Sequence, residues 1–139
     1  MVQIIAGRKG KGKTKYLLGN ANEAIRVTDG TIVYLDKSTQ HIHELDNRIR
    51  LVNITDYPVA STEAFIGFIC GLAASDYDLQ EIYVDSFLKA AAVTPETVAA
   101  TVDQLDVISE QNHVKIVLSV SEDAVNLPES VQEHITISL

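Results

Sequence analysis

The fold is decided by one stretch of eight residues, Gly7-Arg8-Lys9-Gly10-Lys11-Gly12-Lys13-Thr14. It matches the pattern G-x-x-x-x-G-K-[ST] at every fixed position, and it lies between a short apolar run, residues 2–6, and a segment of helical periodicity. Gly7 and Gly12 are expected to adopt backbone angles that residues with a Cβ resist, so that N–H groups can turn inward around an anion. The stretch therefore predicts a phosphate-binding loop between a strand and a helix, the alternative being a flexible lysine-rich turn.

The side chains of this loop have distinct expected roles. Lys13 is expected to reach the β- and γ-phosphates of a nucleotide, and the Thr14 hydroxyl to bind Mg²⁺. The helix that begins near Lys13 directs its positive end to the same point. The residues expected to surround the phosphates are Gly7, Arg8, Lys9, Gly10, Lys11, Gly12, Lys13, Thr14 and Lys15.

Strand-like and helix-like stretches alternate along the rest of the chain. Apolar runs predict further strands over 31–35, 50–54, 81–84, 115–119 and 135–139. Helices are predicted from Tyr16 to a stop at Gly30, over 61–74, from Thr94-Pro95-Glu96 onward, and for one turn within 128–133. This alternation predicts an α/β fold, a three-layer sandwich around a mostly parallel sheet of five or six strands, formed by a single domain over residues 1–139.

Four residues lie at or just after the ends of predicted strands: Gly7, Asp36, Asp85 and Ser119. Ligands of open parallel sheets bind at the carboxyl ends of the strands. The strand pattern and the loop motif, which are independent observations, therefore predict a site at the same edge of the sheet.

Apolar patterning also predicts which residues are buried. The 61–74 helix is apolar nearly all round, which predicts a largely buried helix with the lone cysteine, Cys70, in the core. Tyr16, Phe65, Phe68 and Phe87 are likewise expected in the core rather than on a surface that stacks a base. A single cysteine forms no internal disulfide, which fits a reducing compartment.

The distribution of charge favours a small anionic ligand. The formal net charge is −8, yet five of the eleven basic residues fall within positions 8–15. The strongly acidic remainder argues against a nucleic-acid footprint, while one concentrated basic spot suits a small polyphosphate. The chain shows neither a signal-peptide pattern at its start nor an apolar stretch near the roughly 20 residues of a membrane span, so we expect a cytoplasmic protein with no membrane span.

These residues give the chain a resemblance to the P-loop NTPase superfamily. Residues 7–14 resemble its Walker A motif, and Glu81-Ile82-Tyr83-Val84-Asp85 resembles its Walker B strand, whose aspartate holds Mg²⁺ through water. The strand placement and Ser119 are most similar to the RecA-like and ATPase branch, and nearly the whole chain resembles small stand-alone bacterial P-loop proteins catalogued beside pilus-retraction (twitching motility) ATPases. The resemblance implies binding of ATP (or ADP) with Mg²⁺ and slow ATP hydrolysis, with Lys13 and Asp85 in catalytic roles; a protein partner or a homo-oligomer is left open.

The chain departs from that branch after its Walker B aspartate. Many ATPases of the branch place a catalytic glutamate there, whereas this chain has Ser86. Asp36 is the candidate to position the attacking water, its alternative being a turn cap. Ser119 is the candidate sensor residue, its alternative being a strand-end hydroxyl. The missing glutamate motivates a second hypothesis, a nucleotide-dependent interaction module that does not hydrolyse its ligand.

Other functional classes have less support in the sequence. A GTPase would need N-K-x-D and D-x-x-G motifs, which the chain lacks, and a small-molecule phosphotransferase would need an arginine-bearing lid, whereas no arginine follows Arg50. Arg48 and Arg50 are interpreted as solvated charges, with a role as arginine fingers in a neighbouring subunit as the alternative. His41 and His43 lack the further ligands that zinc requires, which favours a surface loop.

Overall fold

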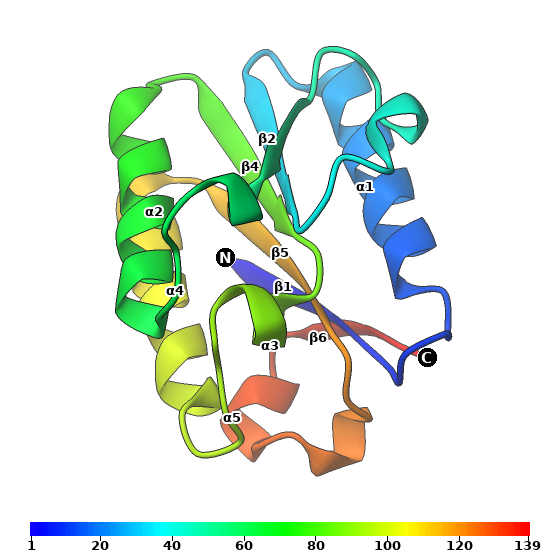
Figure 1. Ribbon diagram of the computed structural model, residues 1–139, viewed down its shortest axis with the longest axis vertical. Helices are drawn as coiled ribbons and strands as arrows, with labels where there is room; N and C mark the ends of the chain where they lie inside the picture. The colour runs from blue at the N-terminus through cyan, green and yellow to red at the C-terminus, as the bar shows by residue number, and fades with distance from the viewer.

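Six strands form one sheet in which every neighbouring pair is parallel. The structure, a computed structural model, describes all residues from Met1 to Leu139 (Figure 1). The strands are β1 (Val2–Ala6), β2 (Thr31–Asp36), β3 (Arg50–Asn53), β4 (Leu79–Val84), β5 (Lys115–Val120) and β6 (Ile135–Ser138), in the spatial order β3-β2-β4-β5-β1-β6. The predicted α/β class and largely parallel sheet are confirmed, with six strands and no antiparallel pair.

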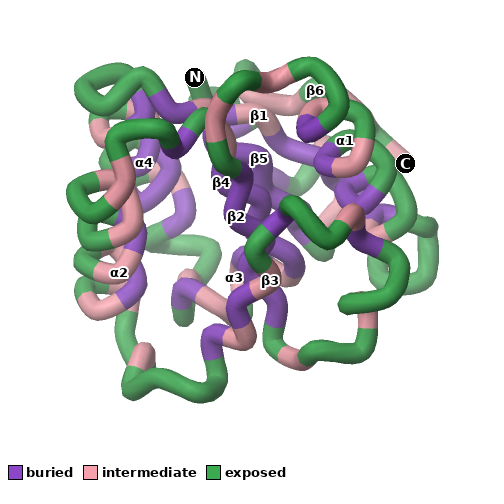
Figure 2. Tube along the Cα trace, turned by 90° about the horizontal axis from the view of Figure 1, so that it is seen from above, coloured by how far each residue is buried: buried purple, intermediate pink, exposed green.

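Helices cover both faces of this sheet. The helices are α1 (Lys13–Val27), α2 (Thr62–Ser75), α3 (Phe87–Ala90), α4 (Val98–Asn112) and α5 (Glu129–Gln132), and three 3₁₀ turns span Ile42–Glu44, Ile54–Asp56 and Ala124–Asn126. Seen from above, the buried strands lie between α1 on one side and α2 with α4 on the other (Figure 2). The three layers predicted from the alternation of strands and helices are therefore present.

Side-chain alternation along the strands creates two cores. Successive residues of a strand point to opposite faces, so Ile4 packs in the larger core beneath α2 and α4, whereas Ile5 packs beneath α1. Tyr34 and Tyr83 belong to the α1 core and stack with ring centroids 6.3 Å apart. The same alternation, continued past the last apolar residue of each strand, sets the polar residues of the site on the α1 face.

Helix α1 forms where the spacing of apolar residues predicts it. Leu17, Ala21 and Ile25 are buried against the sheet. The prediction that Gly30 ends this helix is wrong, because α1 ends at Val27. Gly30 instead lies in the turn before β2, where a Cβ would come within 2.1 Å of the Asp78 carbonyl oxygen. The absence of a side chain at Gly30 is thus required by close packing rather than by helix termination.

Helix α2 is less buried than its composition predicts. Ser61 caps it, because its Oγ accepts a hydrogen bond from the Ala64 N–H at 3.1 Å, but only Phe65 and Ile69 are buried. Cys70 is exposed, which corrects the prediction that it lies in the core. The reason is that α2 forms an outer layer, so only one stripe of it faces the sheet.

No helix of the protein combines the length and the apolar character that crossing a membrane requires.

Two further predictions from the sequence are wrong. Helix α4 begins at Val98 rather than at Pro95, since Thr94 and Thr97 close a preceding turn in which the Thr94 N–H donates to Thr97 Oγ1 at 3.0 Å. Tyr16 was expected in the core, yet it is 46% exposed because it points away from the buried stripe of α1. Neither difference alters the placement of the site.

Candidate phosphate-binding site

The glycine-rich loop joins β1 to α1 at the carboxyl edge of the sheet. Gly10 and Gly12 have φ of 89° and 90°, a left-handed conformation that residues with a Cβ seldom adopt. Gly7 differs from the expectation, because its backbone is not in this region and its role is steric: a Cβ there would lie 3.0 Å from the Cβ of Leu139. The Leu139 N–H donates to the Ala6 carbonyl at 2.8 Å, which holds the end of the chain against the loop.

A methyl group added to Gly12 is expected to destabilise the fold by about 1–2 kcal/mol, because alanine resists the left-handed conformation. The matched control is Gly19→Ala, which adds the same methyl group to the middle of α1 in open space. That control is expected to stabilise the protein by about 0.5–1 kcal/mol. Urea unfolding of both variants measures the difference, and equal effects would contradict the loop conformation.

Several N–H groups of the loop have no hydrogen-bond acceptor within the protein. They belong to Lys9, Gly10, Gly12, Lys13 and Thr14, whose amides donate to no backbone or side-chain atom, and all five residues line one cavity. Backbone N–H groups are strong donors that seldom remain unpaired unless water or a ligand accepts them. A loop with this many available amides at a helix N-terminus suits an anion with several oxygen atoms.

Lys13 is buried beside these amides. Its side chain is about 7% exposed, and Nζ donates to the Arg8 carbonyl oxygen at 3.0 Å. Burial lowers the pKa of Lys13 below its ordinary value of 10.5, and the negative charge of Asp85 opposes this shift. A buried ammonium whose single hydrogen bond is to a loop carbonyl retains two donor positions for another acceptor.

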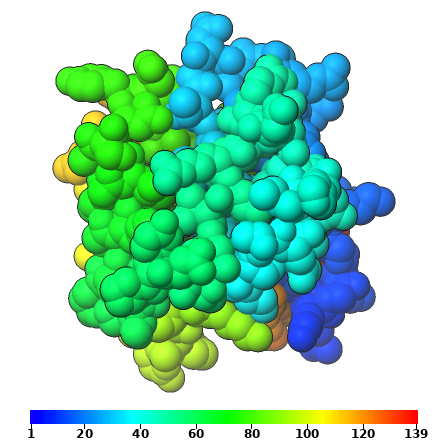
Figure 3. Space-filling model, turned by 45° about the horizontal axis from the view of Figure 1, so that its top comes forward, coloured from blue at the N-terminus to red at the C-terminus, as the bar shows by residue number.

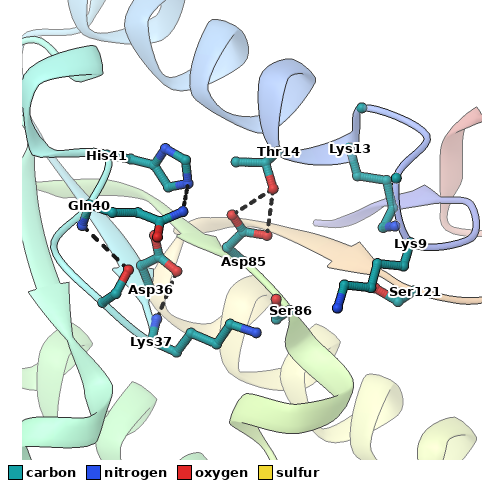
Figure 4. A pocket seen from close by; sticks show the side chains of 13 residues that line it. Lys9, Lys13, Thr14, Asp36, Lys37, Gln40, His41, Asp85, Ser86 and Ser121 are labelled. Atoms are coloured by element: carbon teal, nitrogen blue, oxygen red, sulfur yellow. Dashed lines mark hydrogen bonds between the residues drawn. The ribbon is translucent and has the colours of Figure 1, made fainter.

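The Asp85 carboxylate accepts hydrogen bonds from hydroxyl groups of three other elements. Thr14 Oγ1 of α1 donates to its Oδ2 at 3.1 Å, and Ser119 Oγ of β5 donates to its Oδ1 at 2.8 Å. The buried Tyr34 hydroxyl of β2 donates to Oδ2 at 3.2 Å, and burial together with Asp85 raises the pKa of Tyr34. Figure 4 shows the Thr14 hydroxyl directed at both oxygens of Asp85, with dashed lines marking the contact. The structure therefore brings Thr14, Asp85 and Ser119 together, on the face where alternation along the strands places them.

Asp36 lies at the end of β2, next to Asp85. The Asp85 N–H donates to the Leu35 carbonyl at 2.9 Å, which fixes the ends of β2 and β4 side by side. Asp36 is about 5% exposed; its Oδ1 accepts from the Lys37 N–H at 2.7 Å, whereas its buried Oδ2 has no partner. Burial raises the pKa of Asp36 and the Asp85 carboxylate adds to the rise, while the Lys37 N–H opposes it. A buried carboxylate oxygen without a hydrogen-bond partner is rare in folded proteins, and water or a ligand group placed beside it would satisfy it.

Replacing Asp36 with asparagine is expected to raise the stability of the free protein at neutral pH by about 0.5–2 kcal/mol, because it removes a buried charge and keeps the oxygen that faces Lys37. The pKa of Asp36 is raised on folding from 3.8, so the native state binds more protons and the carboxylate costs stability as pH rises above that value. The gain should therefore disappear below about pH 4. Unfolding measured at pH 4 and pH 7.5 tests this, and a variant equally destabilised at both values would contradict it.

One open cavity of about 640 Å³ joins these groups. None of its lining residues is hydrophobic; they are Lys9, Gly10, Gly12, Lys13, Thr14, Asp36, Lys37, Ser38, Gln40, His41, Asp85, Ser86 and Ser121. The segments that follow β1, β2, β4 and β5 meet at this edge, as their blue, cyan, yellow-green and orange colours show (Figure 3). The cavity is thus built for polar and charged ligand groups and has no apolar wall for a base.

Some residues predicted for the site lie outside the cavity lining. Gly7 is buried at the start of the loop, and Lys11 and Lys15 are exposed to solvent; none of the three lines the cavity. Arg8 Nε forms an ion pair with Asp123 Oδ2 at 2.7 Å, which ties the loop to the segment after β5. Ser119 does not line the cavity either, since it is buried behind Asp85 and orients that carboxylate.

The site also contains residues that the sequence did not indicate, from the segments that follow β2 and β5. Lys37, Gln40 and His41 come after β2, and Ser121 follows β5. His41 was expected in a surface loop, but it lines the cavity and its ring nitrogens contact Gln40 and Glu44. Their proximity to Asp36 and Ser119 along the chain was the one signal that could have indicated them.

Two other features of the sequence have local partners. Arg48 forms two hydrogen bonds to Asp46, from Nε at 3.0 Å and from Nη2 at 2.9 Å, and these lower the pKa of Asp46 to about 2. Ser86 follows Asp85 with a left-handed φ of 54°, and its N–H donates to Ser119 Oγ at 2.8 Å. The residue after Asp85 therefore carries a hydroxyl at the cavity wall, and its backbone is hydrogen-bonded to β5.

Comparison with the models of known protein families gives no match for this chain, and comparison with curated proteins gives none. The case for a function therefore rests on the geometry of the cavity and on the sequence of the loop.

Proposed function

We propose that the chain is a P-loop nucleotide-binding domain whose cavity binds the phosphates of ATP or ADP together with Mg²⁺. One observation carries the proposal: five amides without acceptors, the buried Lys13 ammonium and the contact between Thr14 and Asp85 all lie at one polar cavity. Amides and an ammonium are donors for phosphate oxygens, and a hydroxyl beside a carboxylate offers oxygen ligands for Mg²⁺.

The donor set fits magnesium better than a metal held by the protein alone. No group of three or more His, Cys, Asp or Glu side chains is arranged to hold a metal ion. Magnesium typically takes one or two protein oxygens and completes its octahedron with water and phosphate oxygens. Thr14 and Asp85 supply such a pair, and Ser119 and Tyr34 orient the carboxylate. When bound, Mg²⁺ would neutralise charge on the phosphates.

In ATP hydrolysis at this site, Lys13 and Asp36 would have different roles. Lys13 would exchange the Arg8 carbonyl for a phosphate oxygen and stabilise charge that develops there. Water would attack the γ-phosphate in line and ADP would leave. The unpaired Asp36 Oδ2 is the candidate acceptor for a hydrogen of that water, and its raised pKa makes it a stronger base than an ordinary aspartate.

The conformation of Ser86 favours a second function, nucleotide binding without turnover. The residue directly after Asp85 is a serine, and its hydroxyl cannot accept a proton as a carboxylate would. The Ser86 N–H donates to Ser119 Oγ, which fixes the backbone at this position. In this case the bound nucleotide would set the state of the segments after β2 and β4 for a protein partner or a second copy. The two functions share the site and differ only in turnover.

Release of inorganic phosphate from Mg-ATP by the purified full chain distinguishes these functions. We expect slow, steady release that Lys13→Ala abolishes and that Asp36→Asn lowers about 100-fold, with nucleotide affinity retained in the Asp36 variant. Nucleotide binding without release would support the module instead. Release that persists in Lys13→Ala would reveal a contaminating enzyme and would contradict ATPase activity at this site.

A further inference from the structure

A second, smaller hollow adjoins the cavity on the side of α3. It has a volume of about 210 Å³ and is lined by Lys9, Lys37, Ser86, Leu88, Lys89 and Ser121. Lys9, Lys37, Ser86 and Ser121 also line the main cavity, whereas Lys89 does not. We call it the three-lysine hollow.

The three lysines come from different elements and converge on one place. Lys9 belongs to the loop after β1, Lys37 follows β2, and Lys89 lies on α3. Figure 4 shows the side chains of Lys9 and Lys37 extending from opposite sides toward Ser86. Three separate segments of the chain therefore direct positive charge to the same hollow.

No acidic side chain forms an ion pair with these lysines, although the charge of Lys37 acts on the nearby Asp36 carboxylate. None of the three ammonium groups forms an ion pair or a hydrogen bond within the protein, and no carboxylate lines the hollow. The chain carries 19 acidic and 11 basic residues, so a group of three unpaired lysines runs against the composition of the protein. Like charges repel one another, and an anion seated between them would relieve that repulsion.

The hollow also contains neutral hydrogen-bond donors that could bind a phosphate. The Ser86 and Ser121 side chains line it beside the lysines, and hydroxyl and ammonium groups together bind tetrahedral oxyanions. Lys13, Thr14 and Asp85, which would hold the nucleotide phosphates and Mg²⁺, lie outside it. An anion in the hollow would therefore be additional to those phosphates.

We propose that the three-lysine hollow is a second phosphate subsite, which holds a phosphate group beside the nucleotide. This inference rests on the proposed function for the identity of its neighbour, although the hollow itself is defined without it. The phosphate comes from one of two sources: inorganic phosphate released by hydrolysis, or the phosphate of a second, phosphorylated ligand. Because the lysines are exposed and salt screens their charge, we expect only weak affinity for a single phosphate.

The test is ³¹P NMR of inorganic phosphate titrated with the full chain, with and without saturating Mg-ADP. The informative variant is Lys89→Gln, because Lys89 lines the hollow but not the main cavity. The control is Lys115→Gln, which removes the same charge at the opposite end of β5, where Lys115 pairs with Glu81. We expect saturable binding in the presence of Mg-ADP that weakens about tenfold in Lys89→Gln and is unchanged in the control.

Three outcomes separate failure of the subsite from failure of the proposed function. Phosphate that competes with Mg-ADP and depends on Lys13 rather than Lys89 occupies only the main loop, which overturns the subsite. The absence of saturable binding overturns it too. Phosphate binding that depends on Lys89 in a protein that does not bind Mg-ADP supports the subsite and refutes the proposed function.

The source of the phosphate is read from a second titration with phosphoserine. Tighter binding of phosphoserine than of inorganic phosphate, lost in Lys89→Gln, identifies the phosphate of a second ligand. Inhibition of ATP turnover by inorganic phosphate, relieved in the same variant, identifies the hydrolysis product.

Discussion

Replacing Lys13 with methionine is expected to remove most of the stabilisation by Mg-ATP and to raise the Tm of the free protein. The ammonium is buried and donates its one hydrogen bond to the Arg8 carbonyl, which also accepts from the Lys11 N–H and so keeps a partner in the variant. The pKa of Lys13 is lowered on folding from 10.5, so at neutral pH its charge costs stability, and the gain should shrink as pH rises toward that value.

The loss of binding is the larger of the two effects. A ligand at 100 times its dissociation constant adds about 2.7 kcal/mol to the free energy of unfolding, which for a chain of this length is a Tm shift of roughly 9 °C. Removing a charge-assisted donor should weaken binding about 100-fold and so eliminate most of this shift.

The control for Lys13→Met is Arg26→Ala, which removes one positive charge from the other end of the same helix. Arg26 is exposed and its one ion pair, to Glu23, is long at 3.8 Å. This variant should retain the full Mg-ATP shift. A Lys13 variant that keeps the full Mg-ATP shift, or an Arg26 variant that loses it, would show that the ligand is held by general charge and not by this site.

Replacing Asp85 with asparagine is expected to remove the effect of Mg²⁺ on nucleotide binding. The carboxylate is the one acid in contact with the Thr14 hydroxyl, and an amide is a poor ligand for Mg²⁺. We expect the affinity for Mg-ATP to fall about 10–100-fold, to the level that the wild type shows for ATP in EDTA. Calorimetric titration with and without Mg²⁺ measures this.

Asp103→Asn makes the same chemical change on the exposed face of α4 and should leave both affinities unaltered. An Asp85 variant that keeps the full Mg²⁺ dependence would refute its role as the metal-holding acid. Asp85 would then serve only to anchor the hydroxyl groups of Ser119 and Tyr34.

The sheet and the loop could be predicted from the sequence because their signals are local. Buried parallel strands form continuous apolar runs, and the strands predicted over 31–35 and 115–119 differ from β2 and β5 by one residue each. The loop combines glycines at fixed spacing with a strand before it and a helix after it. Asp36 and Asp85 were found because strand ends gather at one edge of a parallel sheet.

What could not be predicted depends on which surfaces meet in three dimensions. The apolar composition of α2 predicts burial on all sides. However, no further layer of the protein covers the outer side of α2, so Cys70 is exposed. Gly30 resembles a helix stop, whereas its small size is required by a contact with Asp78 across the sheet edge. His41 and Lys89 reach the site only because the segments after β2 and β4 fold over the strand ends.

The most direct measurement of the central claim is isothermal titration of Mg-ATP into the wild-type chain, with Mg-ADP as competitor. We expect one saturable site per chain, displaced by Mg-ADP and weakened about 100-fold in Lys13→Met. No saturable heat at millimolar Mg-ATP, in a protein shown to be folded, would contradict the account and would leave the loop without a nucleotide to bind.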